Sequence, residues 1–378
     1  MDKKMIEIRE AVTKKDVKNF VDFPTRLYKG VKEYSYPLRM DELNMFNSKK
    51  NLAYKDCEVA LFLAYKDGEV AGRIAGIVQG LYNKKVNEKR VRFTRFDCIN
   101  DLEVAKALFL AVEYWAKQKG MDIVHGPLGF NDLDCEGLIV EGFNERCTFE
   151  ERYNFEYYKD LVEACGYEKE VDWLERKIFP PKQKNARVER IANIVAKRNK
   201  LKFATAKNKS EFIKKYKDGI LEVLDKAYSP LYGVVPYTED AKKQLIAQFK
   251  MFLDLRFMFV IVNEKDEVIS FGVSIPQLNE ALYKSKGRLT LPAMFRVLKA
   301  LKAPKVVDFA IIGVRPDYAN EGVGALAIKY LMDNMAKEGI EYCETNICLE
   351  NNVKINSTWE YFDHEVHRRR RAYVKKIS

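Results

Sequence analysis

The stretch 306–339 reads VVDFAIIGVRPDYANEGVGALAIKYLMDNMAKEG and carries the strongest structural signal in the chain. Its first nine residues are mostly apolar and β-branched, which predicts a buried strand. After a turn rich in Pro, Asp, Asn and Gly, apolar residues recur at helical spacing up to Gly339, the expected C-cap. We therefore predict a strand, a glycine turn and a helix in direct succession.

The glycine turn is a candidate ligand site. Gly322 and Gly324 have no side chain, so the backbone there can approach a ligand closely. The unpaired N–H groups of the first helical turn would then face an anion. An ordinary strand-to-helix turn can carry the same glycines, so the glycines alone do not separate the two interpretations.

The residues around the glycines add a family resemblance. Val314, Pro316, Tyr318 and the run 321–326 (EGVGAL) resemble the acyl-coenzyme A motif of the GNAT superfamily of N-acyltransferases. Where that family usually has Gln or Arg, this sequence has Ala319. The resemblance implies acetyl-CoA or a longer acyl-CoA as co-substrate. The implied contacts are Gly313, Val314, Glu321, Gly322, Val323, Gly324, Ala325 and Asn352, of which Asn352 has a second interpretation as a helix cap.

Length and composition indicate a folded protein of two domains. The chain has 378 residues, of which 47% are hydrophobic and 12% aromatic. No apolar run approaches the roughly 18 residues of a membrane span, and the first residues do not resemble a signal peptide, so we expect a cytoplasmic location. Seven cysteines without a Cys-x-x-Cys pair and three scattered histidines predict neither a disulfide framework nor a metal site.

The net charge of +11 is concentrated in one stretch. Between residues 177 and 217, fourteen Lys and Arg accompany only two acids, and a second basic run occupies 368–371. One interpretation is a solvated surface and a basic linker. The other is attraction of an anionic partner, either a membrane surface contacted peripherally or the phosphates of coenzyme A. No recognition motif accompanies the charge, so we expect no nucleic acid partner.

The two halves of the chain repeat one order of elements. In the first half we predict strands at 5–12, 59–65, 70–79, 90–98, 122–125 and 167–178, and helices at 14–30, 102–119 and 153–164. In the second half we predict strands at 201–206, 257–262, 268–275, 306–314, 340–348 and 371–377, and helices at 209–227, 325–338 and 355–362. The expected fold is therefore α/β (α+β) with mixed sheets, in two tandem GNAT-like domains.

A pair of prolines marks the expected domain boundary. Pro180 and Pro181 interrupt regular pairing, and a basic, helix-like segment follows them. We therefore place an N-terminal domain at 1–179, a basic linker at 180–200 and a C-terminal domain with the acyl-CoA motif at 201–378.

The first half has no glycine turn. At the equivalent place, 99–104, it carries two acids that would repel a diphosphate, so we expect no coenzyme A there. Its loop 126–138 is instead rich in Gly and acids. That loop is either a structural Ω-loop or part of a substrate cleft. In the second interpretation Asp132, Asp134 and Glu136 hold the amine of the acceptor.

A second resemblance covers most of the chain. The segment 126–143, the tyrosines of 153–158 and the C-terminal segment from Trp359 to Tyr373 resemble a bacterial group of tandem N-acyltransferase-like proteins that includes the bacterial ceramide synthases. This resemblance implies a small-molecule or lipid amine as acceptor.

The GNAT resemblance also implies a mechanism, direct attack of an amine on the thioester. Backbone N–H groups near Gly313 and Val314 would polarise the carbonyl. Asp308 and Glu344 are candidate general bases because each interrupts an apolar strand, although either could face solvent at a sheet edge. Tyr361 is the candidate general acid for the departing thiolate.

Three functions remain open at this point. The first is an acyl-CoA-dependent N-acyltransferase in which the first half shapes the acceptor site. The second is aminoacyl transfer of the cell-wall-precursor type, which also uses tandem copies of this fold. The third is a non-catalytic GNAT-like protein that binds acyl-CoA or another ligand.

Overall fold

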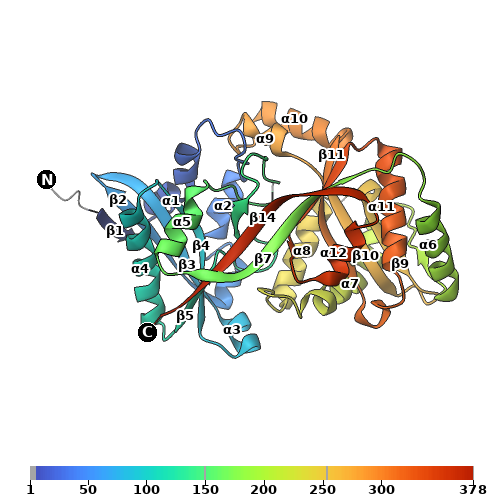
Figure 1. Cartoon of the computed structure of the whole chain (residues 1–378), viewed down its shortest axis with the longest axis horizontal. Helices are drawn as coiled ribbons and strands as arrows, with labels where there is room; N and C mark the ends of the chain where they lie inside the picture. The colour runs from blue at the N-terminus through green and yellow to red at the C-terminus, as the bar shows by residue number, and fades with distance from the viewer. Residues whose placement is uncertain (1–5, 149, 253, 378) are drawn as a thin grey trace. The chain divides into compact units, whose positions relative to one another are not determined.

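The chain forms two compact units, which Figure 1 shows as ribbons. The structure, a computed structural model, describes residues 6–148, 150–252 and 254–377. Unit 1 comprises residues 1–174, 278–298 and 367–378, and unit 2 comprises residues 175–277 and 299–366. The units therefore differ from the two linear halves expected from the sequence, because two segments of the second half belong to unit 1.

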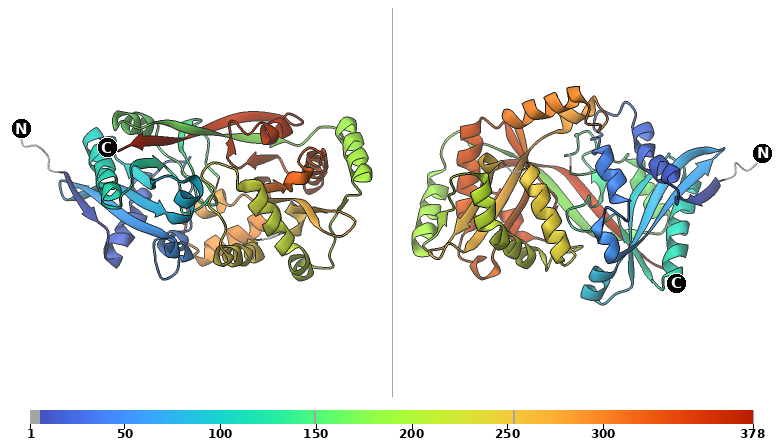
Figure 2. Two further views of the ribbon diagram at one scale, coloured as in Figure 1. Left: turned by 90° about the horizontal axis from the view of Figure 1, so that it is seen from below. Right: turned by 180° about the vertical axis from the view of Figure 1, so that it is seen from behind.

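Unit 1 is built mainly from the first half of the chain. Its elements are β1 (Ile6–Glu10), α1 (Lys14–Leu27), α2 (Arg39–Met45), β2 (Cys57–Lys66), β3 (Glu69–Gln79), α3 (Gly80–Val86), β4 (Arg90–Cys98), α4 (Leu102–Gln118), β5 (Ile123–Gly126), β6 (Leu138–Glu141), α5 (Tyr157–Ala164), α9 (Asn279–Tyr283) and parts of β7 (Glu168–Phe179), α10 (Leu291–Lys302) and β14 (Asp363–Lys376). The strand order is β1-β2-β3-β4-β5-β14-β7, so the last strand of the chain lies between β5 and β7. In the left view of Figure 2 the red β14 runs beside the green β7.

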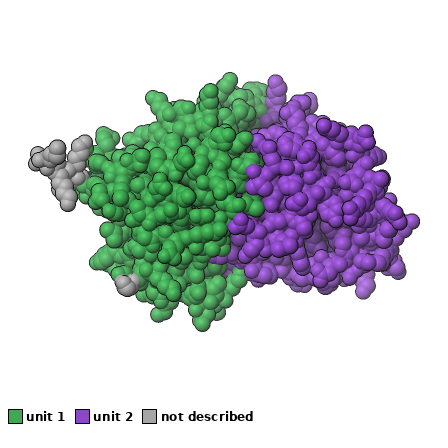
Figure 3. Space-filling model, viewed as in Figure 1, with its two compact units in different colours: residues 1–174, 278–298, 367–378 green, residues 175–277, 299–366 purple. Residues whose placement is uncertain are grey.

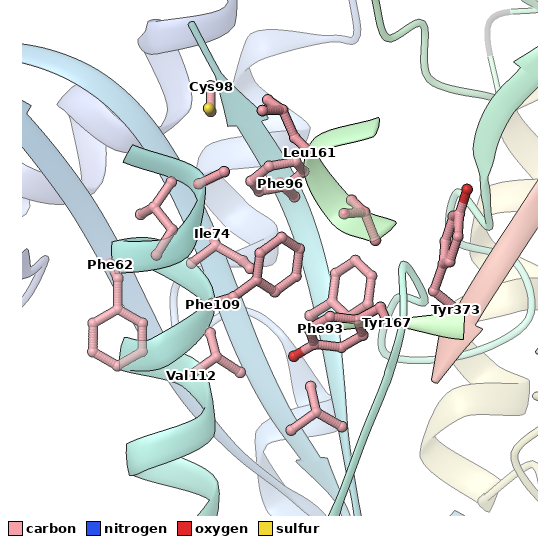
Figure 4. Close-up of a cluster of buried hydrophobic side chains, with 14 of the residues drawn as sticks. Phe62, Ile74, Phe93, Phe96, Cys98, Phe109, Val112, Leu161, Tyr167 and Tyr373 are labelled. Atoms are coloured by element: carbon pink, nitrogen blue, oxygen red, sulfur yellow. The ribbon is translucent and has the colours of Figure 1, made fainter. Parts of the chain in front are cut away.

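Alternating apolar residues let helices cover both faces of this sheet. In β2, Phe62 packs with α4 on one face, whereas Leu61 and Leu63 pack with α1 on the other. Figure 4 shows the α4 side, where the ring of Phe109 lies 4.7 Å from that of Phe96 and 4.6 Å from that of Tyr167. Burying such aromatic side chains contributes much of the stability of a core.

Unit 2 contains the predicted strand, glycine turn and helix. Its elements are the remainder of β7, α6 (Ala186–Arg198), β8 (Lys202–Phe203), α7 (Lys209–Tyr228), α8 (Glu239–Phe252), β9 (Met258–Val262), β10 (Val268–Pro276), β11 (Val306–Val314), α11 (Gly324–Glu338), β12 (Tyr342–Thr345), β13 (Cys348–Leu349), α12 (Val353–Trp359), the C-terminal end of α10 and the start of β14. The strand order is β8-β9-β10-β11-β12-β7.

Helices cover both faces of the unit 2 sheet as well; Figure 3 colours this unit purple. Met258 and Val260 of β9 pack with α7 on one face, whereas Phe259 and Ile261 pack with α6 and α11 on the other. The stretch 186–198 is thus a helix whose buried face belongs to the core of unit 2. The predicted C-cap of α11 is confirmed, since Gly339 is left-handed with φ +68°.

The two units share one topology, as the repeated order predicts. β4 and β11 each pair antiparallel with the preceding strand, β3 or β10, and parallel with the following strand, β5 or β12. Each also carries a β-bulge. In β4 the register shifts near Arg95, which has φ +52°, and in β11 it shifts at Ala310.

Two sequence interpretations need correction. The run 368–371 is not a solvated basic surface, because it lies within β14 and Arg368 and Arg370 are 1% and 0% exposed. Asp172, itself buried, pairs with Arg369 and Arg371, which explains how a strand can hold four arginines in succession. In addition, α8, α9 and α10 occupy stretches where the sequence analysis predicted no element.

Two further expectations can be compared with the structure. All seven cysteines are free thiols, in agreement with the absence of a predicted disulfide framework. Among the described residues, no helix is long and apolar enough to cross a membrane.

Unit 1 contains a buried histidine that makes its stability depend on pH. His125 is 0% exposed, and its Nδ1 lies 3.2 Å from a carboxylate oxygen of Glu170. Burial lowers the pKa of His125 from 6.5 to about 4. Because the unfolded histidine binds its proton at higher pH than the folded one, the free energy of unfolding should fall as the pH drops from 6.5 towards 4.

We expect this histidine to account for about 3 kcal/mol of stability lost over that pH window. Chemical denaturation of the natural chain and His125→Gln at several pH values would measure the loss as the difference between their slopes, because buried carboxyls with raised pKa, such as Glu150, act in the opposite sense in both chains. A His125→Gln variant with the same slope as the natural chain would contradict this assignment.

Candidate active site

The site is organised around the place where β11 and β12 part. Their parallel pairing runs from Val306↔Tyr342 to Phe309↔Thr345 and then stops. Asn346 closes the pairing, since its N–H donates to the Phe309 carbonyl at 3.2 Å and its side chain donates to the Ala310 carbonyl at 3.3 Å. β11 continues to Val314, so one edge of its last residues has no strand partner within the described chain.

The bulge at Ala310 changes which way β11 faces. Before it, Val307 and Phe309 pack on the α11 side of the sheet. After it, Ile311 packs with α7 on the opposite side, although strict alternation would keep it on the α11 side. The bulge therefore changes which face of the sheet the β11 side chains point to, directly after the last residue that pairs with β12.

The open edge of β11 carries backbone groups at two positions. Hydrogen bonding alternates along an antiparallel pair, so Gly313 is bonded to Phe271 of β10, whereas the N–H and C=O groups of Ile312 and Val314 point away from β10. The hydroxyl of Tyr228, at the end of α7, donates to the Ile312 carbonyl at 3.0 Å and accepts from its N–H at 3.4 Å. The sequence analysis did not single out Tyr228.

Gly313 has a packing role in this structure. A β-carbon there would lie 2.7 Å from the ring of Phe271, closer than real side chains approach. Gly313 and Val314 were both predicted to polarise a carbonyl. The backbone groups of Val314 lie on the open edge, whereas those of Gly313 hydrogen-bond to β10.

The two candidate bases lie side by side. Asp308 and Glu344 are register partners on β11 and β12, one position before the strands part. They are 3% and 2% exposed, so the interpretation that either faces solvent at a sheet edge is wrong. Gln277 donates to Asp308 Oδ1 at 3.2 Å, and Lys177 of β7 is the register partner of Glu344. Two buried carboxylates thus lie next to the place where β11 and β12 stop pairing.

The glycine turn lies beyond the other end of the open edge. Gly322 is exposed and left-handed, with φ +77°, which explains why glycine stands there. Space is open around Gly324, since a β-carbon built on it would have no neighbour within 4 Å. The N-cap residue of α11, Val323, makes no side-chain cap hydrogen bond. Ala325 donates its N–H to the Gly322 carbonyl at 3.0 Å, and no side chain caps the amides that precede it.

A cation from α6 stands beside this turn. Arg198 donates to the Glu321 carboxylate at 2.8 Å and to the Glu321 carbonyl at 3.0 Å. This pairing offsets the negative charge of Glu321, the acid next to the glycines. It also places a guanidinium next to the glycines, close to where the sequence has Ala319 instead of the family's Gln or Arg.

The remaining unit 2 candidates lie on or near α12. Asn352 is the N-cap of α12, and its side chain accepts from the Ile355 N–H at 3.4 Å, which supports the capping interpretation. Tyr361 was expected inside a helix, but α12 ends at Trp359, and Tyr361 lies beyond it with 42% of its surface exposed. Its role as general acid stays a prediction.

In unit 1, the loop after β5 gathers the three predicted acids. Asp134 accepts from the Phe130 N–H at 2.7 Å, so its carboxylate holds the loop. Glu136 is 5% exposed, and no described residue hydrogen-bonds its Oε1. Burial, with a further contribution from Asp132, raises the pKa of Glu136 well above its usual range. An amine in contact with Glu136 would relieve this uncompensated burial.

The equivalent opening of unit 1 is filled by charged side chains. Arg73 pairs with Asp97 at 2.7 Å beyond the β4 bulge, and Glu42 pairs with both Arg95 and Arg152. Burial alone would raise the pKa of Glu42, but these two arginines outweigh it and lower the pKa to about 2. Only a cavity of about 40 Å³ remains among these groups, room for roughly three water molecules.

The helix after β4 also differs from α11. Asp101 caps α4 by accepting from the Glu103 and Val104 N–H groups, at 3.0 and 3.3 Å. An acidic side chain therefore occupies the place where the uncapped turn of α11 could take an anion. That the first half binds no coenzyme A stays a prediction.

The repeated topology, with its bulged and parted strands, defines a tandem GNAT fold. A tandem GNAT protein from the clavulanic acid biosynthesis pathway, solved without AcCoA, matches the structure with a TM-score of 0.55 at 8% identity, over 99% of both chains. The chain is 28% identical to Protein YghO of Escherichia coli (strain K12), over 98% of this chain and 95% of that protein.

A second curated relative agrees with the resemblance noted in the sequence. The chain is 26% identical to the bacterial ceramide synthase of Caulobacter vibrioides, over 85% of this chain and 83% of that protein. No model of a known protein family matches the chain.

The contact between Tyr228 and the β11 edge can be tested directly. In Tyr228→Phe the Ile312 amide loses its hydroxyl partner, and a hydrogen bond worth about 1 kcal/mol corresponds to roughly fivefold faster amide exchange. Hydrogen exchange followed by mass spectrometry would measure the change. In the matched control Tyr330→Phe, which removes a hydroxyl bonded to the Met258 carbonyl, Ile312 exchange should not change. Equal Ile312 exchange in Tyr228→Phe and the natural chain would contradict the contact.

Proposed function

We propose that the protein is an acyl-CoA-dependent N-acyltransferase whose unit 2 binds the acyl-CoA. The observation that supports this best is the open edge of β11, which runs from two buried carboxylates to an uncapped helix N-terminus. Unit 1 has the same topology, but charged side chains fill its opening and Asp101 caps its helix. Unit 2 alone therefore offers both an anion site and a backbone edge for an extended ligand.

In this proposal three parts of unit 2 hold the acyl-CoA. The amides of 322–324 bind the diphosphate, as helix N-termini commonly do. Ile312 and Val314 offer N–H and C=O groups to the amides of the pantetheine arm, so Tyr228 must leave Ile312. The seven residues from Asp308 to Val314 are six steps apart and span about 20 Å of strand, which suits an extended arm between the diphosphate and the carboxylates.

Asp308 or Glu344 then serves as the general base. The amine nitrogen attacks the thioester carbonyl, a C–N bond forms and the C–S bond breaks. The carboxylate takes the proton lost by the amine, and the departing thiolate takes a proton in turn. A backbone N–H on the β11 edge, at Ile312 or Val314, stabilises the oxyanion. Tyr228, which already touches this edge, is a second candidate beside Tyr361 for the proton donor.

The acyl group we propose is longer than acetyl. A cavity of about 40 Å³ in unit 2 is lined almost wholly by apolar side chains from α7, α8, β9 and β10. Its apolar lining favours hydrocarbon over water, and its volume matches the first few carbons of a chain. Its lining residues are Phe212, Ile213, Lys217, Ile220, Leu221, Ile246, Met258 and Val273.

We propose a small-molecule or lipid amine as acceptor. Glu136 of unit 1 is the residue best suited to hold an ammonium group, because it is buried and its Oε1 has no hydrogen-bond donor within the described chain. The named activity of the Caulobacter relative supports a lipid acceptor in particular. An acyl-CoA co-substrate also fits the cytoplasmic location expected from the sequence.

Calorimetry with acetyl-CoA and a long-chain acyl-CoA tests the proposed ligand. We expect both to bind, the long chain more tightly. Gly322→Asp should abolish binding, because it adds a negative charge at the turn and forces a side chain into a left-handed backbone. Gly339→Asp is the matched control, since Gly339 is also left-handed but lies at the other end of α11.

Absence of binding by the natural chain would overturn this function and leave aminoacyl transfer or another ligand. Unchanged affinity in Gly322→Asp would show that the diphosphate binds elsewhere.

The paired carboxylates can be tested by conservative substitutions. In Asp308→Asn and Glu344→Gln shape and hydrogen bonding are largely kept, so folding should persist while the base is lost. Once an amine screen has supplied an acceptor, kcat measured by thiol release should fall about 10² to 10⁴-fold in at least one variant, with little change in acyl-CoA affinity. Asp333→Asn, an exposed acid of α11 paired with Lys329, should keep full activity. Full activity in both buried variants would exclude these carboxylates as bases.

A further inference from the structure

One helix of the protein shows its apolar face to solvent. α10 is the orange helix along the upper edge of Figure 1. Four large apolar side chains project from it at positions i, i+3, i+4 and i+7, the spacing of a single helical face. They and the preceding Leu289 are exposed as follows: Leu289 58%, Leu291 74%, Met294 48%, Phe295 73% and Leu298 60%.

The opposite face of α10 holds the helix to the protein. Ala293 is 0% exposed, and the Thr290 hydroxyl accepts from the Ala293 N–H at 3.4 Å, which caps the first turn. Arg296 donates through Nε to the Ala281 carbonyl at 3.0 Å. The helix is thus anchored through a small residue and a polar contact, with its large apolar residues on the outside.

Positive charge accompanies this apolar face along the chain. The segment 281–305 contains seven Lys and Arg and no acid. Arg288 precedes the helix, and Lys299 and Lys302 follow Phe295 and Leu298 by one turn; all three are exposed. An apolar stripe bordered by cations is the pattern of helices that lie in a lipid interface.

We propose that α10 docks the protein onto an anionic phospholipid surface, with its apolar stripe in the acyl boundary and its cations on the headgroups. A second copy of the chain fits less well, since a symmetric contact would bring the same cationic rim against itself. The basic helix α6 is not the docking element, because Val188, Ala192 and Val195 turn its apolar face into the core of unit 2.

Vesicle flotation with the full chain tests this proposal. The natural chain should float with vesicles of equal parts phosphatidylglycerol and phosphatidylcholine, and far less with phosphatidylcholine alone. Leu291→Gln/Phe295→Gln should lower the partition coefficient at least about tenfold, because each exposed side chain loses its burial in lipid. The matched control is Leu110→Gln/Tyr114→Gln on α4, which changes side chains of similar exposure, 61% and 66%, and should float like the natural chain.

A charge variant separates the two parts of the contact. Lys299→Gln/Lys302→Gln should weaken binding to anionic vesicles several-fold, and added salt should then matter less. Circular dichroism would verify that all variants stay folded. Equal flotation of the α10 apolar variant and the natural chain would overturn the proposal. A natural chain that does not bind anionic vesicles would also overturn it, if that chain forms a dimer and the Leu291→Gln/Phe295→Gln variant is a monomer.

Discussion

The parting of two parallel strands is the constraint on which the rest of unit 2 depends. β11 and β12 can pair only as far as Phe309 and Thr345, because the bulge at Ala310 turns β11 and Asn346 takes over its carbonyls. The backbone N–H and C=O groups of Ile312 and Val314 therefore lie on an edge of β11 without a strand partner. Leaving such groups without a hydrogen bond costs free energy. In the structure the Tyr228 hydroxyl hydrogen-bonds to Ile312. In the proposed function a ligand takes its place.

Comparison of the units shows how one topology can serve two purposes. Both have the bulge and the parted strands, but side chains decide what each opening accepts. In unit 1 an arginine and carboxylate network occupies the opening, and Asp101 satisfies the helix amides. In unit 2 the carboxylates Asp308 and Glu344 sit before the opening, and the helix amides have no side-chain cap. The two units thus share a topology and differ in the side chains that lie where their strands part.

Much of the fold could be predicted because the signals were local. Periodicity and glycine placement predicted β11 and the end of α11, and the strands predicted at 59–65 and 70–79 are confirmed as the paired β2 and β3. The adjacency of Asp308 and Glu344 was not predicted, since it depends on the register between strands 36 residues apart. The burial of the β14 arginines was missed because Asp172, which pairs with two of them, is far away in sequence. α10 was not predicted, because its large apolar residues are exposed and do not form the buried face expected of a helix in a core.

A crystal structure of the chain with coenzyme A would test the central claim most directly. The account predicts the diphosphate within hydrogen-bond distance of the N–H groups of 322–324, the pantetheine arm along Ile312 and Val314, and the Tyr228 hydroxyl displaced from Ile312. Coenzyme A bound in the opening of unit 1, or bound to unit 2 with the β11 edge still closed by Tyr228, would contradict it.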